Sequence, residues 1–157
     1  MRRIVLYGVG LILASVLALS YAATSHANAN RGPLRHTCSV TDRDFIDTAR
    51  TNMAAIALWG QQYGSGDVPA SDVAAQAKRA SKIVAATSPT DPSLQQAQKL
   101  LVAMFDAYGK AMDAQSKNRP AGKSMFHAYG LANLTHDVLV DAEPALAKRG
   151  CDVAPLL

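Results

Sequence analysis

The two cysteines of this chain constrain its fold more than any other sequence feature. Cys38 and Cys151 are the only cysteines, and they stand 113 residues apart, near the two ends of the region with helical periodicity. In an exported protein an even cysteine count indicates a disulfide, and two cysteines allow one pairing. Because the bridged Cα atoms must lie about 5.5–6 Å apart, the beginning and the end of the folded region are predicted to meet.

The first 29 residues have the pattern of an export signal. Arg2 and Arg3 precede an uncharged, apolar run over residues 4–23, and Ala-Asn-Ala follows at 27–29 as a small-x-small cleavage site. A run of about 20 apolar residues can also span a bilayer as a retained N-terminal anchor. With either outcome, the chain from residue 30 onward is expected to be secreted or to lie on the extracytoplasmic face of the membrane.

The charge and composition exclude several classes of protein. A hydrophobic fraction of 49% and a charged fraction of 18% are typical of a folded domain rather than a disordered chain. The formal net charge is only +4, two of the cations belong to the leader, and no run of Lys and Arg with interleaved aromatics occurs. We therefore expect no nucleic-acid binding. Alanine, the strongest helix former, is the most frequent residue, which favours an all-α fold.

Four segments have apolar or small residues at alternating spacings of three and four, which is typical of amphipathic helices. Thr41 is predicted to cap the first helix, Asp67 or Ser71 the second, and Pro92 to begin the third. Pro144 is expected to kink the fourth helix or to start a separate turn. The predicted helices cover about 42–63, 71–87, 92–117 and 121–149.

Short loops between the four helices make neighbouring helices antiparallel. After an even number of such helices the chain returns to its starting end, so four helices satisfy the predicted disulfide, whereas three or five do not. The predicted fold is an all-α, up-down-up-down four-helix bundle over 41–151, with a flexible lead-in at 30–40 and a short tail at 152–157. Alanine and glycine on the apolar stripes predict closely packed helices with little room for a large cofactor.

Scarce aromatic residues near one end of the bundle form the candidate ligand or partner patch. The alternative interpretation is that these side chains simply pack against a neighbouring helix. The candidate residues are Trp59, Tyr63, Phe126, His127 and Tyr129.

Histidines offer a competing hypothesis. His127 and His136 are nine residues apart on one predicted helix, which places them on opposite faces, so they cannot hold one metal together. A haem- or metal-binding bundle would use His127 or His136 with a methionine such as Met53 or Met104. The ordinary interpretation is a partly buried His127 and a surface His136, and we expect no metal and no cofactor.

No catalytic constellation emerges from the sequence. Ser124 lies three residues before His127, but no nucleophile elbow surrounds it, and both cysteines are expected to be oxidised. We predict a non-catalytic exported or cell-envelope binding module whose partner is an unknown protein or small ligand. A membrane-anchored structural protein of the envelope is the other alternative, with membrane contact only through an uncleaved N-terminal segment.

Overall fold

The computed structural model describes residues 37–157, and this part of the chain contains helices and no strand. The export signal, the possible anchor and the lead-in up to residue 36 lie outside the described residues. The prediction of an all-α fold with four helices is confirmed. The elements are α2 (Val40–Ser65), α3 (Ala70–Ala85), α4 (Pro92–Ser116), α5 (Gly122–Lys148) and the short 3₁₀ helix η2 (Ala154–Leu156).

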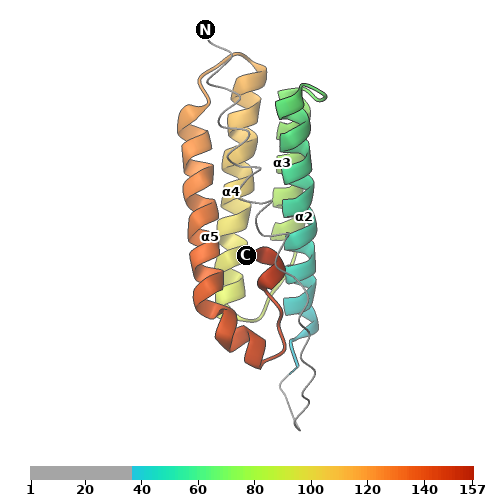
Figure 1. The fold of residues 1–157 in the computed structure, drawn as a ribbon, viewed down its shortest axis with the longest axis vertical. Helices are drawn as coiled ribbons and strands as arrows, with labels where there is room; N and C mark the ends of the chain where they lie inside the picture. Colours follow the sequence, from blue (N-terminus) through green and yellow to red (C-terminus); the bar gives the residue numbers. More distant parts are fainter. Residues whose placement is uncertain (1–36) are drawn as a thin grey trace.

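The four helices run alternately up and down, as the colour sequence in Figure 1 shows, and the arrangement is consistent with a four-helix bundle. Helix α2 packs on α3, α3 on α4, and α4 on α5. Helices α2 and α5 do not pack extensively on one another; instead, η2 lies between them and contacts both. The predicted short tail is therefore part of the packing, with Val153 and Leu156 buried.

The helix ends follow local sequence signals, with two corrections. Ser39, not Thr41, caps α2, because its hydroxyl accepts a hydrogen bond from the Asp42 amide at 3.0 Å. Helix α3 begins after Pro69 without any side-chain cap. Gly66 ends α2 with a φ of 87°, a left-handed conformation that glycine adopts without steric penalty.

Pro144 does not divide the last helix. Helix α5 continues through it to Lys148, and Figure 1 shows the final turns bending across the base of the bundle. A proline near the C-terminal end of a helix removes one ladder hydrogen bond, and the remaining bonds keep the helix continuous.

The core confirms most of the predicted stripes. The α3 stripe is fully buried, and Gly109 of α4 lies so close to α3 that an added Cβ would be 3.4 Å from the Ala77 Cβ. On α5 the prediction is wrong for Leu134, which is 53% exposed, and for the exposed Ala145. Because α5 packs mainly on α4, it buries a narrow arc. That arc includes Leu139 and Leu146.

None of the helices between residues 37 and 157 is long and apolar enough to cross a membrane.

Candidate functional site

The base of the bundle is closed by the predicted disulfide, which is confirmed. Cys38 precedes α2, Cys151 follows α5, and their Cα atoms lie 4.8 Å apart. Both residues are buried and belong to the hydrophobic core. The bond therefore joins the two ends of the described fold, as the helix count requires.

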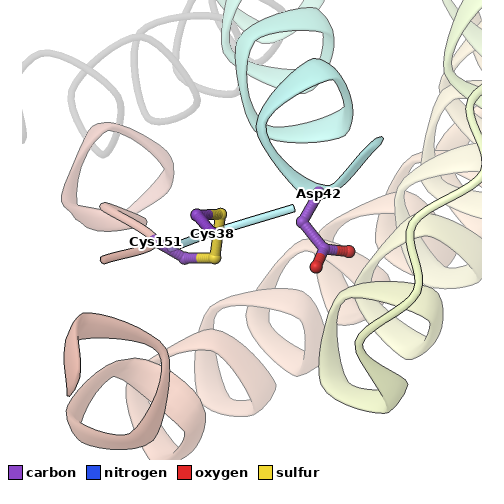
Figure 2. A group of neighbouring side chains, drawn as sticks. All are labelled: Cys38, Asp42 and Cys151. Carbon is purple, nitrogen blue, oxygen red and sulfur yellow. A yellow bond between two sulfur atoms is a disulfide. The ribbon is translucent and has the colours of Figure 1, made fainter. Parts of the chain in front are cut away.

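Asp42 lies beside this disulfide, as Figure 2 shows. The two sulfur atoms and an Asp42 carboxylate oxygen lie within 4.8 Å of one another, a spacing that metal ligands can have. The sulfurs, however, are bonded to each other and are not thiolates. The Asp42 oxygens accept hydrogen bonds from the Thr90 amide at 2.6 Å, the Thr90 hydroxyl at 3.0 Å and the Asp91 amide at 3.1 Å. This arrangement is that of a structural carboxylate.

The same hydrogen bonds set the acidity of Asp42. Burial by itself would raise the pKa of this carboxyl group. Hydrogen bonds from the Ser39 hydroxyl, from the Asp91 and Thr90 amides and from the Thr90 hydroxyl outweigh burial, and together they lower the pKa below its ordinary value. The carboxylate is therefore the favoured form in the folded protein.

A second buried carboxylate extends the contacts to the end of α5. Asp91 caps α4, accepting hydrogen bonds from the Ser93 amide at 2.8 Å and the Leu94 amide at 3.3 Å, and its other oxygen pairs with the Arg149 guanidinium. We call Asp42, Thr90, Asp91 and Arg149 the polar clasp. It joins the start of α2, the α3–α4 loop and the end of α5. It could not be predicted from the sequence, since nothing local relates residues 42, 91 and 149.

The opposite end of the bundle carries the aromatic residues Trp59 and Tyr63 of α2 and Tyr108 of α4. Tyr108 of α4 is buried, and its hydroxyl would lie 3.3 Å from a Cβ placed on Gly60 of α2, so the absence of a side chain at Gly60 makes room for it. Burial, with the nearby Tyr63 hydroxyl, raises the pKa of Tyr108 to about 12. Tyr108 is therefore a neutral phenol whose hydroxyl lies against α2.

The structure places the five residues of the predicted patch on two helices. Trp59 and Tyr63 of α2 are partly buried and pack against the core. Phe126 and His127 of α5 are exposed, and Tyr129 is half-buried. Helices α2 and α5 do not pack extensively on each other. Trp59 and Tyr63 on α2 therefore form one surface, and the three residues on α5 form another.

The histidines that could hold a haem or a metal are both exposed on α5. Met53 and Met104, their possible partners, are partly buried on α2 and α4. The haem or metal hypothesis stays a prediction, and an absorption spectrum after addition of haem would test it.

Gln115 is a polar residue in a core-facing position near the end of α4, on the side of the bundle opposite the disulfide. Its side-chain Oε1 is buried and has no hydrogen-bond partner among residues 37–157. Gln115 follows Tyr108 by seven residues on α4, which places both on one face of the helix. A buried acceptor without a donor destabilises a fold by about 1–3 kcal/mol. The sequence signal was available, because Gln115 occupies a core-facing position of the α4 stripe.

Replacing Gln115 by methionine is expected to stabilise the protein by about 1 kcal/mol, since an apolar side chain of similar size removes the unpaired acceptor. Urea unfolding would measure the difference. Gln98→Met on the same helix is the matched control, because Gln98 Nε2 donates to the Val84 carbonyl at 3.0 Å and the Thr87 carbonyl at 2.6 Å. The control should be destabilised by about 1–2 kcal/mol. Equal losses in both variants would contradict the assignment.

The comparisons with known proteins find no matching family model, no similar curated protein and no similar solved structure. The class that the fold defines is an all-helical, disulfide-closed bundle.

Proposed function

We propose that the protein is an exported, non-catalytic binding module that receives its ligand or protein partner at the aromatic end. We define the aromatic end by Trp59, Tyr63, Tyr108 and Gln115. The observation that carries the proposal is the buried Gln115 oxygen, which has no hydrogen-bond partner among residues 37–157. Native proteins rarely leave such a group unpaired, and a donor from a bound partner would satisfy it.

The residues at this end favour one class of ligand chemistry. Trp59 and Tyr63 are partly buried, so each leaves some aromatic surface open to solvent. Aromatic side chains bind apolar groups through large contact areas and supply polar atoms at their edges. A partner with an apolar body and at least one N–H or O–H donor fits the aromatic end. Because the Gln115 oxygen is buried in the unbound protein, the donor reaches it only when the side chains around it move on binding.

The exported location rests on two independent features. The leader pattern over residues 1–29 favours export, and the disulfide is typical of proteins that fold in an oxidising compartment. A retained anchor would add tethering to the envelope without changing the binding role. N-terminal sequencing of the mature protein tests this point: a start at Asn30 indicates cleavage, whereas a start at Met1 or Arg2 indicates an anchor.

Binding at the aromatic end is expected to depend on Gln115. Immobilised protein should retain a defined component of a cell-envelope extract, and Gln115→Met should weaken that retention about three- to tenfold, the effect of losing one hydrogen bond. Trp59, the only tryptophan, should report the same binding by a fluorescence shift. Leu58→Ala, at an exposed neighbouring position on α2, is the control and should bind normally.

Two results would contradict the proposed function. Equal retention by wild type, Gln115→Met and Trp59→Ala would remove the aromatic end as the binding site. Reproducible turnover of a substrate by the purified protein would contradict its non-catalytic character.

A further inference from the structure

Helix α5 has three large apolar side chains exposed to solvent, and the two most exposed, Phe126 and Leu134, lie on its outer face. Phe126 is 80% exposed and Leu134 is 53% exposed. They are eight residues apart, with Gly130 midway between them. The core-facing positions of α5, among them Ala128 and Leu139, are buried on the opposite side of the helix. An exposed phenylalanine and leucine about 12 Å apart along one helix form an apolar strip that the described chain leaves uncovered.

Gly130, at the centre of this strip, has no packing reason to be glycine within residues 37–157. A Cβ added there would meet nothing within 4 Å. At Gly60 and Gly109, by contrast, an added Cβ would meet a neighbouring helix at 3.3 Å and 3.4 Å. Gly64 and Gly122 are as open as Gly130, but they lie in the last turn of α2 and the first turn of α5, whereas Gly130 lies inside a helix. Glycine within a helix lowers its stability relative to alanine. Its presence at this exposed position is explained if another backbone approaches it from outside.

Two opposite charges on this face lie symmetrically about Gly130, and a third charged residue, Asp141, has no counterpart on α5. Lys123 lies seven residues before it and Asp137 seven residues after it, both exposed. Neither takes part in an ion pair within the part of the chain that the structure describes. Seven-residue steps place the three residues nearly in line along the helix. Phe126 and Leu134 lie four residues before and after Gly130. Each of these four residues thus has a complementary counterpart at the same distance on the other side of Gly130.

We propose that the outer face of α5 binds a second copy of this chain, with the two α5 helices antiparallel and crossing at Gly130. A twofold axis through Gly130 places Lys123 against Asp137 of the second copy and Phe126 against Leu134 of the second copy. Such an interface is isologous, so each contact occurs twice. The strip is about 21 Å long and one helix wide. With a helix width of about 10 Å, the strip covers on the order of 200 Å². Because this area is smaller than the roughly 800 Å² per partner of a standard interface, the dimer is weak and reversible.

Sedimentation equilibrium of the protein isolated as the cell produces it, with the disulfide intact, tests the proposal. Wild type should show a reversible monomer–dimer equilibrium. Lys123→Asp and Asp137→Lys, each alone, place like charges together at two points and should weaken the dimer about tenfold or more. The double variant Lys123→Asp/Asp137→Lys restores both pairs and should dimerise within about threefold of wild type. Phe126→Asp should abolish the dimer, whereas Leu58→Asp on α2 should not affect it.

Gly130→Gln separates an interface role from a structural one. Glutamine is a better helix former than glycine, so the variant should melt at a higher temperature, yet its side chain blocks the crossing and the dimer should be lost. A wild-type protein that stays monomeric up to about 1 mM, a weak affinity even for transient complexes, would overturn the proposal. A dimer that tolerates Phe126→Asp, or one that the double charge exchange fails to restore, would overturn it as well.

Discussion

Removing the Cys38–Cys151 disulfide should lower the free energy of unfolding by about 4 kcal/mol. The bond closes a loop of 113 residues. In the chain-entropy model such a cross-link lowers the conformational entropy of the unfolded chain and so raises its free energy by about 4–5 kcal/mol. A loss of this size is a large part of the net stability of a small domain. Urea unfolding of Cys38→Ala/Cys151→Ala against the oxidised wild type measures it.

Two comparisons make the disulfide prediction specific. Reduced wild type should unfold with the same midpoint as the double alanine variant, because both lack the cross-link. The loss should extend to the C-terminal segment, since Val153 and Leu156 are buried directly after Cys151. Hydrogen exchange at η2 should therefore accelerate first. A difference below about 1 kcal/mol would mean that noncovalent contacts alone hold the two chain ends together.

Asp42→Ala should destabilise the protein by about 3 kcal/mol. Asp42 is 5% exposed, and its removal leaves the Thr90 and Asp91 amides without their acceptor. A buried N–H without a partner is unfavourable by about 1–3 kcal/mol. Asp44→Ala is the matched control, because Asp44 lies in the same turn of α2 and is exposed. It should lose less than about 1 kcal/mol. Similar losses in the two variants would contradict the role of the polar clasp.

The pH dependence of stability should identify the same carboxylate. The pKa of Asp42 is lower in the folded protein than in the unfolded chain, where an aspartate has a pKa of about 3.9. Its stabilisation is fully present above the unfolded value and is lost as pH falls through the folded value. The difference in unfolding free energy between wild type and Asp42→Asn should therefore shrink as pH is lowered from about 5 towards 2. A difference independent of pH would show that the charge of Asp42 is unimportant.

The helices could be predicted from sequence because their signals are local. The spacing of apolar residues on α3 identified its fully buried stripe, and Pro92 correctly marked the start of α4. The rotation of α5 was harder to predict. Leu134 and Leu139 are both leucines on an apolar helix, and only the position of α4 decides which of them is buried.

The candidate sites were predicted less completely than the fold. Aromatic content pointed to Trp59 and Tyr63, but the unpartnered state of Gln115 depends on which groups surround its side chain. The outer face of α5 is a similar case. Phe126 is exposed because of the rotation of α5 about its own axis, and the packing of α5 on α4 sets that rotation.

The sequence by itself determined the helical class, the number of helices and the pairing of the two cysteines, since periodicity, breaker residues and a single possible pairing are properties of the chain. The tertiary structure decided which side of α5 faces the core, placed η2 between α2 and α5, and assembled the polar clasp from residues 42, 90, 91 and 149. Those features depend on contacts between residues far apart in the chain, and the energies of such contacts arise only when the helices have packed.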